Sequence, residues 1–467
     1  MTLSAEKLFD ELGQQYEESY VNNSGLEDAI DCALKELSPK SQVLDVGCGT
    51  GKPVATRVAR AGHKIHGIDI SQEMVNIASR QVIGRFEKAD MTTFQPSMQY
   101  DAIFTIFSMF QLSHSQTYSM MFKYSEWLET GGLLVLGTIP STSLVDDESL
   151  YDASGKIVRH ADLLFMGRRF LGTVYTKDGW RDLFRAAGFE IQLERSFVFN
   201  AKPPYDKEVQ DHYLIIAKKV VDHALMGPYP LPTSYRGPHP LSEAAWAPFS
   251  ERLVRDEFNA VLEVIKGNKK VLDVGSGYGM QIQEAQAQGV TICSGSAEKI
   301  PFCDRTFDAA VAMWVLHYVD DLDKSLREIA RVVDPSSPNS RIVIVQGAPD
   351  NELVNLLNDV CAPLSAQNTA IDHQGYLLSA AATVFAEYGF GDVEVFRVNA
   401  YCAFPEEDLT ERCQKAAEVL AAFWFRDDSN FVQMKEALIP HLKLHFRDRP
   451  YAINDEVAVL VAKPLPN

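Results

Sequence analysis

A glycine-rich segment that follows an apolar run is the clearest place for ligand chemistry in this chain. Residues 43–46 read Val-Leu-Asp-Val and lead into glycines at positions 47, 49 and 51. Glycine has no Cβ and adopts positive φ, so the backbone of such a turn can approach a ligand closely. Asp69 ends the next apolar run, 24 residues after Asp45. This spacing predicts a carboxylate that accepts hydrogen bonds from both hydroxyls of a ribose.

The glycine spacing also bears on which nucleotide would bind. A nicotinamide-dependent dehydrogenase would need a glycine at the third position of Gly-x-Gly-x-x-Gly, where this chain has Lys52. A dinucleotide is therefore the lesser alternative. A plain tight turn stays open for the glycines, as do a structural role for Asp45 and a helix N-cap for Asp69 and Asp90.

Two further segments could face a substrate. The first runs from Phe107 to His114 and the second from Arg159 to Tyr175, each after an apolar run. Histidine can act as a base near neutral pH, and arginine binds carboxylates. The catalytic candidates are Gln111, His114 and His160, and the candidates for substrate binding are Phe107, Gln111, Arg168 and Arg169. Surface ion pairs for the arginines, and a helix cap or loop position for the histidines, are the structural alternatives.

Strand-like and helix-like stretches alternate around these residues. The strand-like runs of the first half are 42–46, 64–69, 100–106, 133–138, 190–199 and 212–217. Such alternation predicts a doubly wound, mainly parallel α/β sheet with helices on both faces. Apolar residues at near-helical spacing predict a helix over 115–130 that ends at Gly131-Gly132. Near the N-terminus, Tyr16 and Tyr20 lie one helical turn apart.

The glycine segment occurs twice in the chain. The pattern at 43–51 recurs at 271–279, an offset of 228 residues in a chain of 467. An offset of nearly half the chain indicates a domain duplication rather than a solenoid repeat. Residues 228–248 hold six of the 22 prolines, a density that disfavours helix and central strand alike. We therefore expect domains over 1–222 and 249–467, joined by a Pro-rich linker over 223–248.

The second copy departs from the first. Residues 307–309 align with 100–102 at an offset of 207, so about a strand and a helix are missing before them. No acidic residue falls where Asp69 would, and Ser296 stands in place of Asp90. The second copy has also gained 38 residues, with helical character, around 350–450. We expect a degenerate, non-catalytic second domain, although Gly275, Gly277 and Gly279 keep a second active site open.

Composition and charge restrict the class of protein and the partners that are possible. The chain has 46% hydrophobic and 23% charged residues, as a globular protein has, and its apolar runs are too short to span a bilayer. A net charge of -19 would repel nucleic acid and anionic lipid. Seven scattered cysteines without a Cys-x-x-Cys pair indicate neither disulfides nor a zinc site. We expect a cytoplasmic protein without nucleic-acid or membrane partners, and a monomer and a homodimer both stay open.

Taken together, these motifs resemble those of the class I S-adenosylmethionine-dependent methyltransferases. Residues 44–51 match the first motif of that family, residues 67–71 match its ribose strand, and Ala89-Asp90-Met91 match its adenine-side turn. Residues 100–104 and 128–136 match the fourth strand and the passage into the fifth. The resemblance covers most of both halves and implies two tandem Rossmann-like α/β domains, the second degenerate.

The resemblance assigns roles to individual residues. Gly47 and Gly49 would pass under the methionine part of the donor, and Asp45 would order its amino group. Asp69 would hold the ribose and Asp90 the adenine amine. The whole set expected to bind S-adenosylmethionine, and its product S-adenosylhomocysteine, without a metal is Tyr16, Tyr20, Asp45, Gly47, Cys48, Gly49, Gly51, Asp69, Ile70, Ala89, Asp90, Met91 and Ile106.

A narrower resemblance concerns the group that accepts the methyl. Residues 51–53 and 66–71 resemble small-molecule methyltransferases of fungal secondary metabolism, and the tandem layout resembles enzymes that esterify carboxyl groups. We therefore expect an O-methyltransferase that forms methyl esters on a small anionic metabolite. A carboxylate is ionised near neutral pH and needs no base, whereas a phenol with a pKa of about 10 usually does. A phenol or amine methyltransferase with a histidine base and a non-catalytic binding module stay open as alternatives.

Overall fold

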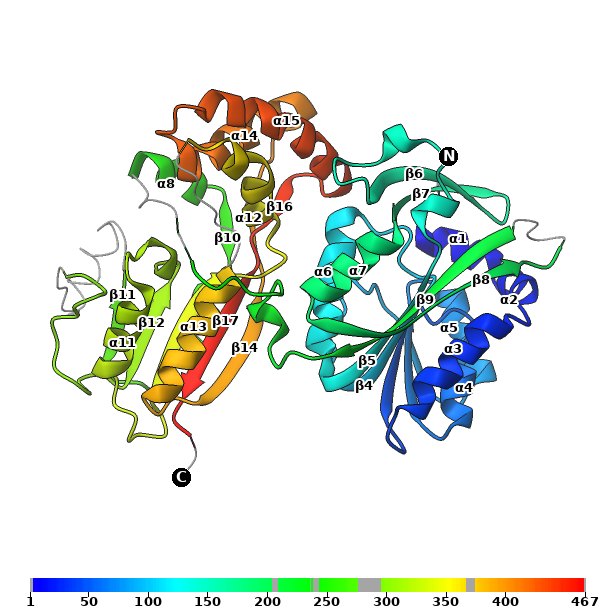
Figure 1. The fold of residues 1–467 in the computed structure, drawn as a ribbon, viewed down its shortest axis with the longest axis horizontal. Coiled ribbons are helices and arrows are strands. Elements are labelled where there is room, and N and C mark those ends of the chain that lie inside the picture. Colours follow the sequence, from blue (N-terminus) through cyan, green and yellow to red (C-terminus); the bar gives the residue numbers. More distant parts are fainter. Residues whose placement is uncertain are drawn as a thin grey trace. The chain divides into compact units, whose positions relative to one another are not determined.

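The chain divides into two units in a computed structural model. The structure describes residues 3–203, 209–235, 237, 243–275, 295–366 and 374–465. The first unit spans Met1–Ala224 and the second Leu225–Asn467. Each unit contains its own sheet with helices packed against it (Figure 1).

The first unit is built on a seven-stranded sheet with the order β3-β2-β1-β4-β5-β9-β8. β1, β2, β3, β4 and β5 run parallel, whereas β9 is antiparallel to both β5 and β8. This arrangement confirms the predicted doubly wound, mainly parallel sheet. The strands are β1 (Gln42–Val46), β2 (Lys64–Asp69), β3 (Arg85–Lys88), β4 (Tyr100–Ile106), β5 (Leu128–Thr138), β8 (Phe189–Asn200) and β9 (Val209–Lys219).

Helices cover both faces of this sheet (Figure 1). α3 (Ser24–Lys35) and α4 (Val54–Arg60) pack apolar residues on one face, and α6 (His114–Trp127) and α7 (Lys177–Ala186) pack on the other. Polar side chains begin several of them: Asn23 caps α3, and Ser113 forms a capping box with Gln116 at α6. α1 (Ala5–Leu12), α2 (Gln14–Ser19) and α5 (Gln72–Gln81) complete the unit.

Two local features of the first unit differ from expectation. The helix predicted over 115–130 ends at Trp127, because Leu128 already pairs with Tyr100 as the start of β5. The segment after β5, expected only as a pocket wall, forms a hairpin of β6 (Ile157–Phe165) and β7 (Arg168–Tyr175). The β6–β7 register shifts between Val158 and Ala161, where His160 has φ +55°. A β-bulge turns nearby side chains in directions that a regular strand would not give them.

The second unit repeats the scaffold. Its sheet has the order β11-β12-β13-β17-β14, which corresponds to β1-β4-β5-β9-β8 of the first unit. Asp101 accepts a hydrogen bond from the Gln42 amide at 2.7 Å, and Asp308 accepts one from the Lys270 amide at 2.9 Å. The strands are β11 (Val271–Val274), β12 (Ala309–Met313), β13 (Arg341–Gly347), β14 (Asp392–Val398) and β17 (Val457–Lys463). The duplication read from the glycine motif is therefore a duplication of structure.

The added residues of the second unit lie between β14 and β17. They form the strands β15 (Ala400–Ala403) and β16 (Ala452–Asn454) and the helices α14 (Leu409–Phe425) and α15 (Phe431–Asp448). α8 (Glu243–Ser250) packs with α14 in a core of its own. Strands corresponding to β2 and β3 are not present among the described residues of this unit, and residues 276–294, with Gly277 and Gly279, lie outside them.

The Pro-rich segment is more structured than a linker. Leu225 and Met226, 3% and 7% exposed, lie in the main core of the second unit. The chain can pack there because Gly375, in α13 (Gln374–Glu387), has no side chain: a Cβ on it would lie 2.0 Å from the Met226 oxygen. Pro248 lies inside the short helix α8, where we expected no helix. The described residues of this segment from Leu225 on thus belong to the second unit.

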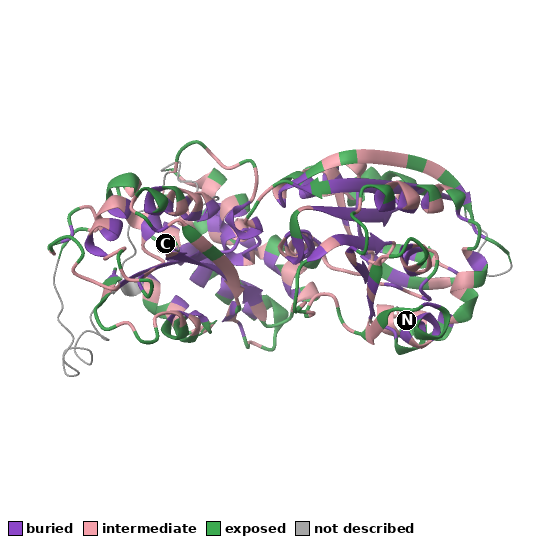
Figure 2. Cartoon of the chain, turned by 90° about the horizontal axis from the view of Figure 1, so that it is seen from below, coloured by how far each residue is buried: buried purple, intermediate pink, exposed green. Residues whose placement is uncertain are grey.

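Burial follows the sheets (Figure 2). β12, β13 and β17 are buried along nearly their whole length, whereas the edge strand β8 alternates between exposed and half-buried residues. α9 (Glu257–Val264) covers one face of the second sheet, and α11 (Leu322–Val332) and α13 cover the other. In the described part of the chain, no helix has the length and apolarity needed to cross a membrane.

Because each unit has its own core, damage to the second core should leave the first unit intact. Phe385 in α13 is fully buried. We expect Phe385→Ala to lower the free energy of unfolding of the second unit by about 3–5 kcal/mol, through lost burial and a cavity. Urea denaturation followed by tryptophan fluorescence measures this. The control Phe258→Ala, at a position 50% exposed, should change little; equal losses in both variants would contradict the assignment of the core.

Candidate functional site

The glycine loop is held by backbone contacts at the carboxyl end of β1. The amides of Gly47 and Cys48 both donate to the Ile68 oxygen of β2, at 2.8 and 3.0 Å. Gly47 has φ +74°, and a Cβ on it would lie 2.2 Å from the Ser108 Cβ. Only glycine fits this position, because any side chain would collide with the segment that follows β4. The predicted close approach of backbone is therefore present.

Two carboxylates lie beneath the loop. Asp69 accepts hydrogen bonds from the Gly49 and Ser71 amides, each at 2.9 Å, and burial raises its pKa to about 6. Asp45 is 2% exposed, and its Oδ2 atom is buried without a hydrogen-bond partner. Burial and, next, the negative charge of Asp69 raise the pKa of Asp45 to about 8. A buried oxygen without a partner is costly, so a ligand that offers a donor or a positive charge here would be stabilised.

Aromatic rings line the space above the loop, and we call Phe9, Tyr16, Tyr20, Phe165 and Phe199 the aromatic wall. A Cβ on Gly49 would lie 3.7 Å from the Tyr16 ring. Tyr16 stacks on Tyr20, with ring centroids 5.2 Å apart, and Tyr20 stacks on Phe199 at 5.6 Å. Burial, Asp69 and Asp45 raise the pKa of Tyr16 to about 12, so its hydroxyl is neutral beside both carboxylates. The two tyrosines named from the sequence are thus brought together with the glycine loop.

The other residues expected around a nucleotide lie along the same edge of the sheet. Gly51 and Cys48 belong to the loop itself, Ile70 follows β2, and Ile106 ends β4. Ala89, Asp90 and Met91 follow β3; the Asp90 carboxylate is exposed and accepts hydrogen bonds from the Thr92 amide and hydroxyl at 2.8 Å. Asp90 therefore caps a turn; no helix begins at this residue, so it does not form the helix N-cap that was its alternative.

A histidine, a tyrosine and an arginine lie near one another on α6, β7 and β6. Nδ1 of His114, at the first residue of α6, lies 2.9 Å from the hydroxyl of Tyr175, at the end of β7. Burial, reinforced by the positive charge of Arg159, lowers the pKa of His114 to about 3. Burial raises the pKa of Tyr175 well above its usual value. Arg159 lies in the bulge of β6, and its Nε atom is buried without a hydrogen-bond partner.

The remaining substrate candidates lie elsewhere on these elements. Phe107, with φ +55°, follows β4 and contacts the His212 ring at 4.4 Å between centroids. Gln111 lies in the loop before α6, and His160 lies in the β6 bulge. Arg169 is 63% exposed and paired with Asp162 at 2.8 Å, and Arg168 lies 3.5 Å from Glu11. Both arginines therefore make the surface ion pairs that were their structural alternative.

Several residues of the site carried no sequence signal. Phe165 and Phe199 come from elements that follow β5, and His212 and Gln210 from the start of β9. Their types are ordinary in strands, and only the folding of the hairpin and of the antiparallel pair β8–β9 brings them beside the N-terminal helices. Arg159 begins the second segment expected to face a substrate, but the sequence does not distinguish it from Arg168 and Arg169, because the bulge in which it lies has no local motif.

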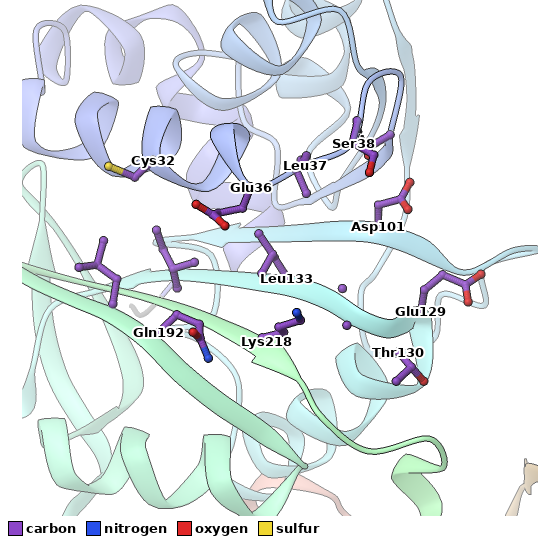
Figure 3. A pocket seen from close by; sticks show the side chains of 15 residues that line it. Cys32, Glu36, Leu37, Ser38, Asp101, Glu129, Thr130, Leu133, Gln192 and Lys218 are labelled. Carbon is purple, nitrogen blue, oxygen red and sulfur yellow. Dashed lines mark hydrogen bonds between the residues drawn. The ribbon is translucent and has the colours of Figure 1, made fainter.

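A described cleft lies away from the glycine loop. It has a volume of about 490 Å³ and opens beside α3, where Glu36, Asp101, Glu129 and Lys218 line it (Figure 3). Asp101 lies near the start of β4 and Lys218 near the end of the antiparallel β9. The cleft is therefore at the amino ends of the parallel strands, opposite the edge where α/β sheets bind ligands. No group of three or more metal-ligating side chains occurs among the described residues.

Parts of both units are similar to known protein families. Residues 43–132 match a family described as a methyltransferase domain, and residues 276–337 match a second family with the same description. Each unit therefore contains a segment that is similar to methyltransferase domains. The first match begins at β1 and ends inside β5, so it includes the glycine loop, Asp45 and Asp69.

Individual relatives are similar to one part of the chain. Demethylmenaquinone methyltransferase of Tropheryma whipplei is 31% identical over 145 residues, which are 29% of this chain and 59% of that protein. Phosphoethanolamine N-methyltransferase of Plasmodium falciparum is 32% identical over 126 residues, 26% of this chain and 47% of that protein. The chain thus spans about half the length of these relatives.

Among solved structures, 1,6-didemethyltoxoflavin-N1-methyltransferase of Burkholderia thailandensis, with bound S-adenosylhomocysteine, is 16% identical. The match covers 47% of this chain and 93% of that one, with a TM-score of 0.35.

The buried Asp45 carboxylate beneath the glycine loop should lower the stability of the protein at high pH. A carboxyl group whose pKa is raised on folding contributes stability below its unfolded pKa, near 4, and loses that contribution as pH rises through about 8. We expect Asp45→Asn to be more stable than the wild type by a few kcal/mol at pH 9 and by little at pH 5. Urea denaturation at several pH values measures the difference. Asp90→Asn, at an exposed carboxylate, is the control; parallel pH curves for Asp45→Asn and the wild type would contradict the burial of this charge.

Proposed function

We propose that the first unit binds S-adenosylmethionine at the carboxyl end of its sheet and transfers the methyl group to a small acceptor. The observation that carries this proposal is the Asp45 Oδ2 atom, buried beneath the glycine loop without a partner. The donor has an ammonium group and a sulfonium, and either offers the positive charge that this oxygen lacks. The two methyltransferase-domain matches and the named relatives support the same activity.

The neighbouring residues fit the rest of such a donor. Asp69 is held by the Gly49 and Ser71 amides at the end of β2, where its carboxylate can accept from ribose hydroxyls. The Tyr16 ring of the aromatic wall lies beside the loop and stacks on Tyr20, and aromatic rings attract cations. When bound, S-adenosylmethionine supplies an electrophilic methyl group on sulfur. The contribution of this chain is to orient the donor and to exclude water, because positioning supplies much of the acceleration of such a transfer.

The second unit is proposed to support the first without binding the donor. Its described sheet starts at β11, so the strands that carry the ribose-side residues in the first unit have no counterpart among the described residues. Ser296, which aligns with Asp90, pairs with Lys299 in an isolated bridge and has no carboxylate to offer.

Titration calorimetry with S-adenosylhomocysteine tests both statements. We expect one site per chain in the wild type and loss of that site in Asp69→Ala, because the variant removes the acceptor for the ribose and for the Gly49 amide. Glu129→Ala, at the cleft on the opposite edge of the sheet, should bind like the wild type. Two sites per chain would show that the second unit binds the donor, and no binding would favour a binding module without methyl transfer.

The acceptor is proposed to be a carboxylate, on the evidence of His114. We propose that the Tyr175 hydroxyl, which keeps its proton because its pKa is raised, donates to Nδ1 of His114; the imidazole hydrogen would then be on Nε2. A histidine with a pKa of about 3 cannot hold a proton taken from a phenol, whose pKa is about 10. His114 is therefore suited to donate a hydrogen bond through Nε2, which an anionic acceptor needs and a phenol does not.

Arg159 supplies the positive charge for such an acceptor. Its guanidinium lies near enough to lower the pKa values of both His114 and Tyr175, and its Nε has no partner. Arg168 and Arg169, by contrast, face carboxylates of the protein. A carboxylate that pairs with Arg159 would remain ionised and nucleophilic without a base.

The chemistry of the product separates a carboxylate from the other acceptors. With methyl-labelled S-adenosylmethionine and a panel of benzoate, hydroxybenzoates, phenol and aniline, we expect label only in products that alkali releases as methanol, as methyl esters do. Arg159→Met should raise the Michaelis constant for the acid at least tenfold with little change in donor affinity. Arg169→Met, on the same hairpin, is the matched control. Alkali-stable label would instead favour the phenol or amine alternative.

A further inference from the structure

A chain of buried hydrogen bonds leads from the start of α3 to the aromatic wall. The Asn23 amide Nδ2 lies 3.2 Å from Nδ1 of His212, and Nε2 of His212 lies 3.0 Å from Oε1 of Gln210. Nε2 of Gln210 then donates to the Tyr20 hydroxyl at 2.7 Å. Asn23, His212 and Gln210 are 3%, 1% and 8% exposed. These four residues are called the Asn23–Tyr20 chain below.

The direction of each bond in the chain follows from its first member. Asn23 is the N-cap of α3, and its Oδ1 atom accepts from the Leu26 amide at 3.2 Å. Its Nδ2 is therefore the atom that faces His212, and Nδ1 of His212 must accept. The imidazole hydrogen is then on Nε2 and is donated to Gln210, which leaves the Gln210 amide nitrogen for Tyr20. A helix cap thus sets the His212 tautomer and the orientation of the Gln210 amide.

His212 is held rigidly and kept neutral. Its ring packs between Phe107, Phe197 and Phe199, at centroid distances of 4.4, 5.4 and 5.1 Å. Burial lowers its pKa to about 4. Protonation would also place a hydrogen on Nδ1 against the Asn23 amide nitrogen, donor against donor. His212 and Gln210 lie two residues apart on β9 and share a face of that strand, so one rigid strand carries both links.

The end of the chain lies beside the proposed donor site. Tyr20 stacks on Tyr16, and Tyr16 lies over Gly49 and influences Asp45 and Asp69 electrostatically. Tyr20 also stacks on Phe199, which pairs with Gln210 across β8 and β9. Any displacement of the Tyr20 hydroxyl would therefore move the ring on which Tyr16 is stacked.

We propose that His212 is a positioning residue for donor binding: through Gln210 it fixes Tyr20, and with it the tyrosine stack that closes over the glycine loop. His212 touches neither donor nor acceptor in this role. The inference rests on the proposed function, because it assigns the aromatic wall to the donor. It adds a residue from β9, nearly two hundred positions from the tyrosines, to the determinants of donor affinity.

Calorimetric affinity for S-adenosylhomocysteine tests this without knowledge of the acceptor. His212→Ala and Tyr20→Phe should each weaken binding about five- to tenfold, and the double variant should bind no more weakly than either single variant, since all three break the same chain. His212→Gln, whose amide can accept from Asn23 and donate to Gln210, should recover most of the affinity. His66→Ala is the control, because it removes a histidine bonded to the Tyr100 hydroxyl at 2.6 Å, with no link to the tyrosine stack.

The outcomes separate this inference from the proposed function. Wild-type affinity in His212→Ala, fully additive losses in the double variant, or an equal loss in His66→Ala would each overturn the positioning role while leaving donor binding in place. Absence of binding in the wild type would overturn the proposed function itself. Nitrogen NMR of the imidazole gives a second readout: the chain requires hydrogen on Nε2 and none on Nδ1 of His212, and the opposite tautomer would contradict it.

Discussion

Burial of the Asp45 carboxylate at the end of β1 is the constraint around which the first unit is arranged. A buried carboxylate is unfavourable in its charged form unless a ligand or a proton neutralises it. The negative charge of Asp69 makes the charged form of Asp45 still less favourable. Hydrogen bonds between the glycine loop and β2 hold the pair in place: the Gly47 and Cys48 amides donate to the Ile68 oxygen, and the Gly49 amide donates to Asp69. The tyrosines of the N-terminal helices and the rings from β6 and β8 then exclude water from above.

The two units share one scaffold and differ in the elements around it. Both units keep the central strands. In each, an aspartate accepts a hydrogen bond from the amide at or before the start of β1 or β11. A residue with positive φ, Phe107 or Trp314, follows β4 or β12. Around that common frame, the first unit has a hairpin and aromatic wall near its glycine loop. The second unit instead has a helical pair, α14 and α15, with an apolar core of its own. Specialisation has taken place in the connections between strands, while the strands themselves are alike.

The parts of the site that could be predicted from sequence are those set by local rules. Glycines, the acidic ends of β1 and β2, and the alternation of strands and helices are local, and they identified the fold and the loop. Tyr16 and Tyr20 of the aromatic wall were predicted, whereas the roles of Phe165, Phe199, Gln210 and His212 were missed, because the β6–β7 hairpin and the antiparallel pairing of β8 with β9 bring them in from far along the chain. The two arginines chosen from sequence are adjacent to Gly167 at the hairpin turn, where exposed charges pair with one another, whereas Arg159 is distinguished only by an irregularity in strand register.

The contact between Gly47 and Ser108 has an evolutionary consequence. In the second unit the same junction joins Gly275 and Val315, where a Cβ on the glycine would lie 2.5 Å from a valine methyl group. Both glycines have positive φ, and a side chain on either would require its partner to move, so glycine is constrained at both junctions. The two copies of the duplicated domain can therefore change freely in their inserted segments. At this junction, by contrast, both copies are restricted to the same few residue types.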